Sequence, residues 1–438
     1  MKLLPPYNTQ QGEYHFERGG LMNRLSRFIL IVMLMALISS AALAEGLKVG
    51  TLFDNSGALT DWGPRHQNAA ELAAQQMAAA GFSIEFFHED SQTAAEAAQK
   101  AARKLITTDK VAVIIGSSSS GVIVPVAESV TSPENVLMIS PGATSPFITD
   151  LPEDKEKDFL FRTCPSDALQ GAVLGRLAAG LYKTASVMYV NNAYGQGLAD
   201  QFRRTFVKHG GTVYTMIPHG EAVATSYAAD LRNAYARMYS TRPFRSGRSD
   251  VLCAFSYPEH AKVYIKEALD IYNAKHFLFC DGTKSEELAA AVGPEKLEGM
   301  MGTAPGAPAG EALLKFNADY TAQFGELPKS PFIANAYDAT ALIGLAAVAA
   351  EAKGLEPTSK NIRDHLREVA NPPGAFIGPG EFEKAFAELK AGKPINYEGA
   401  SGSVDFDANG DVLAPIEIWR FANGKIVTYR MEYFVEKE

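Results

Sequence analysis

Short apolar runs alternate with longer amphipathic, alanine-rich runs from about residue 47 onward. The run 111–116 is apolar throughout, which is typical of a strand buried on both faces. The amphipathic run 63–80 stops at Gly81, and glycine is favoured just past a helix C-terminus. The pattern predicts βαβα repetition and a parallel, doubly wound sheet. Its expected strands are 47–53, 83–88, 111–116 and 136–140, and its expected helices are 63–80, 94–105 and one from about 122.

The same alternation restarts after Pro165, so the chain is predicted to contain two similar α/β lobes. From Gly299 onward the rhythm breaks, and a run from about 332 to 352 is apolar on most faces, which predicts a buried helix. Two Asn-Gly pairs near the end, at 409–410 and 423–424, are hairpin signals. The second set of strands is expected at 185–190, 212–217, 250–255 and 276–279, with helices at 168–181, 197–208, 227–238 and 258–272.

The N-terminal segment has the three parts of a secretory signal. Arg24 and Arg27 precede the apolar run 28–37, and Ala42 and Ala44 are the small residues that a signal peptidase accommodates before Glu45. An uncleaved membrane anchor is the alternative, which the shortness of the apolar run disfavours. Residues 1–44 are therefore predicted to be a signal peptide, and the rest is expected to be an exported, water-soluble protein.

The net charge and the numbers and spacing of cysteine and histidine exclude several classes of function. The formal net charge is −9, and removal of 1–44, with four basic and two acidic residues, leaves −11. An acidic chain is repelled by nucleic acids and anionic lipids. Three cysteines are too few for a disulfide scaffold. The eight histidines form no HxxxH pattern and the cysteines no CxxC, so we expect no metal and no cofactor.

Polar turns that follow the predicted strands are the candidate lining of a cleft between the lobes. Residues 116–121 contain four consecutive serines, and 140–146 repeat the theme after the next strand. Such turns suit an anion, although a flexible solvated turn is the alternative. In the second half, Tyr194, Tyr257 and Asp281 follow three strands. Asp281 suits an ammonium group, or it caps a helix that begins near Glu286.

Six motifs stand in order along nearly the whole exported chain. They are Val49-Gly50-Thr51-Leu52, Gly57-Ala58-Leu59, Ile139-Ser140-Pro141-Gly142-Ala143-Thr144, Phe161-Arg162-Thr163, Ala193-Tyr194-Gly195-Gln196-Gly197 and Gly402-Ser403-Val404-Asp405-Phe406-Asp407. Together they resemble the periplasmic branched-chain amino-acid (Leu/Ile/Val) binding protein family. The resemblance implies a type I periplasmic binding fold, in which two Rossmann-like lobes with parallel sheets are joined by a three-crossing hinge. It also implies delivery of the ligand to an ABC permease in the inner membrane.

The resemblance also implies lobe boundaries and binding roles. Lobe 1 is expected to comprise 45–163 plus 298–405, and lobe 2 to comprise 164–297 plus 406–438. The implied ligand-binding residues are Ser120 for the ligand carboxylate, Gly142 and Thr144 with the intervening Ala143 for the head group, Trp62 as an aromatic cover from lobe 1, Tyr194 and Tyr257 from lobe 2, and Asp281 for the ammonium.

Three departures from the family pattern leave the ligand side chain open. Ser119 stands where the family has a cysteine of a small disulfide, and Asp281 replaces a longer glutamate. The stretch 372–400 is longer than in the simplest members.

The sequence thus predicts a solute-binding protein of an ABC uptake system that binds an amino acid, branched-chain or related. We expect a monomer whose partners are a small-molecule ligand and a membrane permease, with no nucleic acid. A binder of amides, urea or small carboxylates is the alternative, as is a sensor that docks on a receptor. No base–nucleophile pair with catalytic spacing is present, so no catalytic residue is predicted.

Overall fold

The computed structural model describes residues 46–235 and 248–434. The chain divides into two units, 1–45 and 46–438, and only the second contains described residues. The predicted signal peptide lies outside the described residues and stays a prediction.

The first sheet, here the A sheet, has five parallel strands in the order β2-β1-β3-β4-β5. Side chains alternate between its faces. Val49 and Phe53 of β1 pack with α2 and α13, whereas Leu52 packs with α3 and α4 on the other face. The strands are β1 (Leu47–Phe53), β2 (Ile84–Asp90), β3 (Val113–Gly116), β4 (Leu137–Ser140) and β5 (Leu160–Arg162), and the helices are α2 (Gly63–Ala79), α3 (Ala95–Lys104), α4 (Ser120–Val126), α5 (Ser132–Glu134) and α13 (Ile333–Ala352). The A sheet with its helices is called lobe 1.

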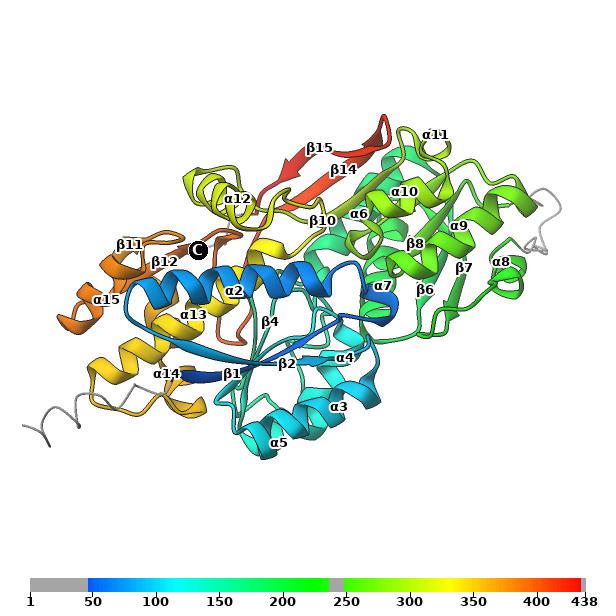
Figure 1. Cartoon of the computed structure of the whole chain (residues 1–438). Coiled ribbons are helices and arrows are strands. Elements are labelled where there is room, and N and C mark those ends of the chain that lie inside the picture. The colour runs from blue at the N-terminus through cyan, green and yellow to red at the C-terminus, as the bar shows by residue number, and fades with distance from the viewer. Residues whose placement is uncertain (1–45, 236–247, 435–438) are drawn as a thin grey trace, which may run out of the picture. The chain divides into compact units, whose positions relative to one another are not determined.

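The second sheet, the B sheet, has seven strands in the order β15-β14-β10-β9-β8-β6-β7. Five of them run parallel, and β14 and β15 are antiparallel additions at one edge. Helices cover both faces (Figure 1). The strands are β6 (Thr184–Val190), β7 (Thr212–His219), β8 (Val251–Phe255), β9 (Phe277–Phe279), β10 (Met301–Pro305), β14 (Ile416–Ala422) and β15 (Lys425–Glu432), and the helices are α6 (Asp167–Leu181), α7 (Ala193–Lys208), α8 (Ala228–Ala234), α9 (Pro258–Tyr272), α10 (Glu286–Val292) and α11 (Pro294–Leu297). This assembly is called lobe 2.

The chain passes between the two sheets three times, after β5, after β10 and before β14, which confirms the three-crossing hinge. Two details of the predicted boundaries differ from the sheet pairing. Residues 301–305 were expected in lobe 1, but β10 pairs with β9 and β14 of the B sheet. Phe406 was expected in lobe 2, yet its side chain packs in the core of lobe 1, where its ring lies 5.0 Å from that of Phe161. The stretch around β10 is rich in glycine, alanine and proline and breaks the periodic pattern of apolar residues, so its strand was missed.

The second Asn-Gly signal forms the predicted hairpin between β14 and β15. Asn423 and Gly424 have φ values of 51° and 73°, the left-handed pair that a tight hairpin turn requires. The first signal closes only an isolated bridge between Phe406 and Val412.

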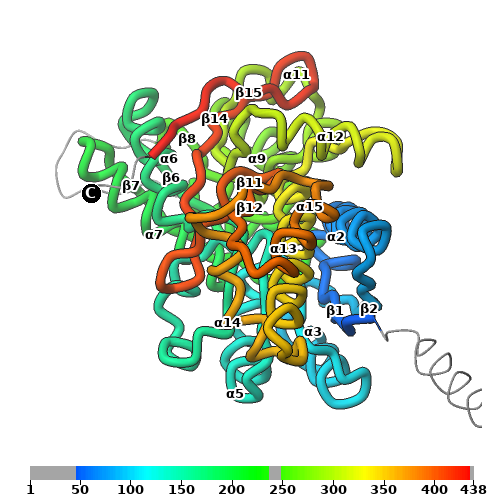
Figure 2. Tube along the Cα trace, turned by 90° about the vertical axis from the view of Figure 1, so that its left-hand side faces the viewer, coloured from blue at the N-terminus to red at the C-terminus, as the bar shows by residue number. Residues whose placement is uncertain are grey.

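The stretch 306–412 adds further elements to lobe 1 (Figure 2). The helix α13 is fully apolar in its middle and is buried as predicted. Among the described residues it is the one helix long and apolar enough to cross a membrane, but 94% of that window is buried inside the protein, as in a core helix. The other elements are α12 (Glu311–Phe324), α14 (Ser359–Ala370), α15 (Phe382–Lys390) and a small sheet of β11 (Ala375–Ile377), β12 (Ile395–Gly399) and β13 (Gly402–Ser403).

Candidate functional site in the cleft between the lobes

A buried carboxylate holds the serine turn, residues 117–120, at the start of α4. Asp54, at the end of β1, accepts hydrogen bonds from Ser91 Oγ (2.5 Å), Ser117 Oγ (2.8 Å) and the Ser118 amide (3.0 Å). Burial raises the pKa of Asp54 to about 6, and these hydrogen bonds oppose that rise. The turn is therefore fixed by the end of a neighbouring strand and is not a flexible loop.

A histidine orients the next serine of the same turn. His66 Nε2 lies 3.0 Å from the Pro331 carbonyl, which only accepts, so Nε2 carries the proton. His66 Nδ1 must then accept from Ser118 Oγ, 2.9 Å away. Burial lowers the pKa of His66 to about 4, which keeps the ring neutral and preserves this direction near neutral pH.

The second turn of lobe 1, residues 140–145, is held by a buried arginine. Arg162 Nη1 donates to the carbonyls of Ala143 (3.3 Å) and Ser145 (2.8 Å), while its Nε pairs with Asp411 at 2.6 Å. The Ser145 amide also donates to Ser120 Oγ at 3.1 Å, which joins the two turns. Because Ser120 Oγ accepts this bond, its own proton remains available for a ligand oxygen.

An aromatic wall lies beside these turns. The rings of Trp62 and Phe332 are 5.6 Å apart, edge to face. A Cβ on Gly142 would come within 2.9 Å of the Phe332 ring and of Ser118 Cβ, so only glycine allows this close packing. Trp62 and Phe332 are both almost fully buried, at 2% and 5% exposure.

Lobe 2 contributes two tyrosines and an acid from the ends of its strands. Tyr194 lies on the first turn of α7, which begins four residues earlier than predicted because Asn192 caps it. Its ring stacks on that of Tyr257 with centroids 5.4 Å apart, and its hydroxyl donates to Asp281 Oδ1 at 2.7 Å. Asp281 begins a short 3-10 turn after β9 and caps no helix near Glu286, where Ser285 is the N-cap.

The two lobes touch directly across this site. Ser119 Oγ and Tyr257 Oη are 2.8 Å apart, and Ser145 Oγ donates to the Ala193 carbonyl at 2.8 Å. Ion pairs close the rim, with Arg65 on Glu287 at 2.6 Å and Lys262 on Asp61 at 3.2 Å. Because these contacts join the two lobes, the cleft between them is closed in this structure.

Two buried acids give the lobe 2 side of the cleft a negative character. Asp167, the first residue of α6, accepts a hydrogen bond from Thr144 Oγ1 at 2.7 Å. Burial raises the pKa of Asp167 well above its ordinary value, and the neighbouring Asp281 carboxylate adds to the rise. Burial likewise raises the pKa of Asp281, although the bonds from Tyr194 and Gln170 oppose it.

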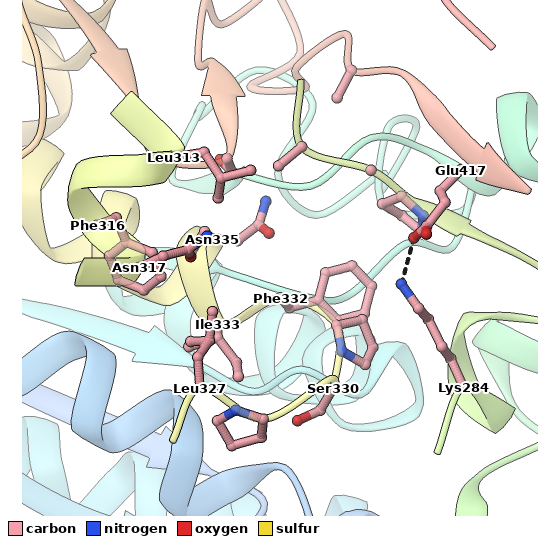
Figure 3. Close-up of a pocket in the computed structure, with 18 of the residues that line it drawn as sticks. Lys284, Leu313, Phe316, Asn317, Leu327, Ser330, Phe332, Ile333, Asn335 and Glu417 are labelled. Carbon is pink, nitrogen blue, oxygen red and sulfur yellow. Dashed lines mark hydrogen bonds and ion pairs between the residues drawn. The ribbon is translucent and has the colours of Figure 1, made fainter. Parts of the chain in front are cut away.

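A separate cavity of about 150 Å³ lies at the hinge (Figure 3). Residues from all three crossings line it, namely Pro165, Pro305 to Ala307, and Ala414. Its wall carries an ion pair between Lys284 and Glu417 (Figure 3). Phe332 lines this cavity and also packs on Trp62, and Pro331, whose carbonyl accepts from His66, lines it as well.

The structure brings most of the predicted site residues around one cleft. Tyr194 contacts both Tyr257 and Asp281. Phe332 packs against Trp62 on one side and lies close to Gly142 on the other. The Ala143 side chain instead packs in the core of lobe 1, so only its backbone faces the turn. Which of these residues contact a ligand stays a prediction.

Five further residues of the cleft were missed by the sequence reasoning. Asp167 follows the N-cap Ser166, and acidic residues are common in the first turn of a helix, so its sequence position gives no sign of a binding role. Phe332 sits in an irregular stretch with φ 67°, for which the sequence gives no signal. The missed residues are His66, Ser119, Asp167, Gln170 and Phe332.

The comparison with family models decides the family. The model described as periplasmic binding protein matches residues 46–392, most of the chain. The chain belongs to the periplasmic binding protein family. Members of this family are solute-binding proteins and not enzymes, and they act in the periplasm. The resemblance to Leu/Ile/Val-binding proteins is thereby confirmed.

Two curated relatives match over most of their length. The chemotactic signal transduction system substrate-binding protein BasB of Halobacterium salinarum is 27% identical over 83% of this chain and 84% of its own. The leucine-, isoleucine-, valine-, threonine- and alanine-binding protein of Pseudomonas aeruginosa is 25% identical over 89% of this chain and 93% of its own.

Solved structures confirm the α/β fold with two parallel-strand sheets. The substrate-binding protein LivJ of Streptococcus pneumoniae, in complex with isoleucine, has a TM-score of 0.69 at 23% identity and covers 89% of this chain and 99% of its own. A solute-binding protein of R. palustris in complex with benzoate also has a TM-score of 0.69, at 19% identity, with 90% and 98% covered. The likeness at this identity concerns the fold alone.

Proposed function

We propose that this periplasmic binding protein takes an amino acid into the cleft between its lobes and delivers it to an ABC permease in the membrane. The observation that carries the proposal is the placement of Asp281, a buried carboxylate that accepts from Tyr194 at 2.7 Å. Tyr194 stacks on Tyr257, which meets Ser119 of the serine turn of lobe 1. A zwitterion needs an acceptor for its ammonium and donors for its carboxylate. Asp281 supplies the first, and Ser120 with its free proton supplies the second.

Closure of the cleft supports a transport role. Contacts such as Ser119 to Tyr257 join residues of different lobes and exist only when the cleft is shut. A ligand that touches both lobes favours the closed form by its differential affinity for that form. A permease can then distinguish the loaded protein from the unloaded one.

A second candidate ligand is an aromatic carboxylate. The rings of Trp62, Phe332, Tyr194 and Tyr257 surround the cleft, and such a wall accommodates a planar ring as readily as an aliphatic side chain. A solved relative in fold holds benzoate. This ligand brings no cation for Asp281, which is why the amino acid is the first proposal.

A thermal-shift screen of the exported chain separates these candidates. The set comprises the L-amino acids, their amides, urea, benzoate and short carboxylates. A ligand that binds only the folded protein at a hundredfold excess over its Kd adds about 2.7 kcal/mol of stability. A shift with amino acids that is lost with their amides supports the proposal. A shift with benzoate and with no amino acid overturns it in favour of the second candidate.

Substitution of the acid tests the head-group assignment. Asp281→Asn removes the charge but keeps the size, and we expect L-leucine affinity to fall at least tenfold. Unchanged affinity would remove Asp281 from the site and leave the fold assignment intact.

A further inference from the structure

The acid that the sequence singled out has a second acid beside it. Asp167 is completely buried and Asp281 is 2% exposed. Gln170, one helical turn after Asp167 on α6, donates its Nε2 to Asp281 Oδ1 at 2.7 Å and to the Thr303 carbonyl at 3.3 Å. The first turn of α6 therefore carries Asp167 and also contacts Asp281 through Gln170, so the two carboxylates are near enough to interact electrostatically.

Three buried polar atoms beside these two acids lack a hydrogen-bond partner in the described part of the chain. Asp167 Oδ1, Gln170 Oε1 and Thr303 Oγ1 have no hydrogen-bond partner among the described residues, although all three side chains are completely buried. A buried polar atom without a partner costs about 1–3 kcal/mol. Asp167 Oδ1 and Gln170 Oε1 accept hydrogen bonds, whereas the Thr303 hydroxyl can accept or donate, so the place favours a ligand group with several N–H donors and a positive charge.

No neighbouring base neutralises the pair by contact. Arg162 is the cation that acts on Asp167, but its nitrogens bind Asp411, Thr149 and the backbone carbonyls of the 140–145 turn. The other ionisable groups that act on the two acids are Cys164, Tyr194 and Cys280, none of which carries positive charge. Two buried carboxylates that share a site without a cation cannot both ionise easily.

We infer that Asp167 and Asp281 hold one proton between them until the ligand binds, and that the ammonium group of the ligand displaces this proton into solvent. The inference rests on the proposed amino-acid function. The step balances because one carboxylic acid O–H bond breaks, a proton leaves to buffer, and the ammonium becomes the countercharge of the resulting carboxylate. The ligand class is thereby an amino compound that arrives protonated.

The contact between Gln170 and Asp281 does not depend on cleft closure. Asp167, Gln170, Tyr194, Asp281 and Thr303 all belong to elements of lobe 2 or to the turns that follow its strands. Opening of the cleft separates Ser119 from Tyr257 but leaves Gln170 bound to Asp281. Gln170 and Asp281 therefore stay together when the cleft opens, whereas the Thr144 bond to Asp167 and the burial of both acids belong to the closed arrangement.

Proton release is measured by isothermal titration calorimetry of L-leucine in two buffers of different ionisation enthalpy at one mildly acidic pH. The difference in apparent binding enthalpy gives the protons released per ligand. We expect a large fraction of one proton for the wild type and at most half of that for Asp167→Asn, which keeps the shape but cannot share a proton. Asp230→Asn on α8, far from the cleft, should release as much as the wild type. Equal release by the wild type and Asp167→Asn overturns the inference even though L-leucine binds.

A ligand-independent measurement separates this inference from the proposed function. A buried neutral carboxylic acid gives an infrared carbonyl stretch apart from that of carboxylates. The ligand-free wild type should show such a band that Asp167→Asn lacks. Absence of any difference overturns the shared proton, whereas a failure of every amino acid to bind overturns the proposed function and leaves the band to be observed.

Discussion

Ser119 of lobe 1 and Tyr257 of lobe 2 meet with their hydroxyl oxygens 2.8 Å apart, across the mouth of the serine turn. Tyr257 Oη also accepts from Asn192 Nδ2 at 3.2 Å, so its single proton is directed to Ser119. The bond exists only in the closed cleft and therefore contributes to closure.

Loss of this bond should weaken ligand binding. We expect Tyr257→Phe and Ser119→Ala each to lower ligand affinity about fivefold, since a hydrogen bond is worth about 1 kcal/mol. The double variant should lose less than the sum of both, and titration calorimetry gives the coupling. Tyr235→Phe is the control because the Tyr235 hydroxyl is buried without a hydrogen-bond partner in the part of the chain described. Strictly additive losses would mean that the two hydroxyls act independently.

A methyl group placed between the lobes should hold the cleft open. A Cβ on Gly197 of α7 would lie 2.7 Å from Pro146 Cδ, and one on Gly121 would lie 2.3 Å from Asn192 Nδ2. Neither partner moves cheaply, because the first is a ring and Asn192 caps α7. We expect Gly197→Ala and Gly121→Ala to lower ligand affinity at least tenfold while each lobe stays folded.

Small-angle X-ray scattering with saturating ligand checks this prediction through a larger radius of gyration in the variants. Gly180→Ala on α6, where nothing lies within 4 Å of the new Cβ, should behave as the wild type. A compact Gly197→Ala with normal affinity would show that the lobes close differently from the arrangement described.

Arg162 and Asp411 form a buried ion pair whose disruption should cost stability. The Arg162 side chain is 0% exposed and that of Asp411 is 13% exposed. Asp411→Asn leaves a buried guanidinium without its counterion, and we expect a loss of about 3 kcal/mol in the free energy of unfolding. Urea denaturation measures it. Glu96→Gln, which breaks an exposed pair with Lys100, should cause no measurable change. A loss as small as that control would contradict the structural role of Arg162.

His260 should make stability depend on pH below neutrality. Burial lowers its pKa to about 4 from 6.5, so between these values the unfolded chain binds a proton that the folded protein does not. Its contribution is intact above pH 6.5 and is lost as the pH falls toward 4, up to about 3 kcal/mol.

Buried acids such as Asp54 act in the opposite direction, since their raised pKa values favour the folded state at lower pH. The informative quantity is therefore the difference between the wild type and His260→Gln, which should increase with pH between 4 and 6.5. The exposed His209→Gln serves as the control. A difference that does not change with pH would mean that His260 titrates alike in both states.

The sequence predicted the periodic elements well because their signals are local. The continuous apolar run at 111–116 became the fully buried strand β3, and the 332–352 run became the core helix α13. The stretches 299–310 and 325–332 lack such periodicity, and there both β10 and the position of Phe332 were missed.

The sequence predicted that the candidate site lies at the ends of several strands. It did not predict which side chains of the site contact one another. Asp167 and Asp281 are 114 positions apart in the printed sequence, and nothing local indicates that α6 brings them together. Ser119 was noted only as a replaced cysteine, because a contact with Tyr257 requires knowledge of how the lobes meet. Pairings between distant segments depend on tertiary packing, which single-sequence patterns do not contain.

Phe332 is the wall between two spaces, the cleft and the hinge cavity. A ring that separates two compartments cannot shift in one without altering the volume of the other. Displacement of the Phe332 ring from the cleft side would therefore change the packing of the three crossings that line the hinge cavity.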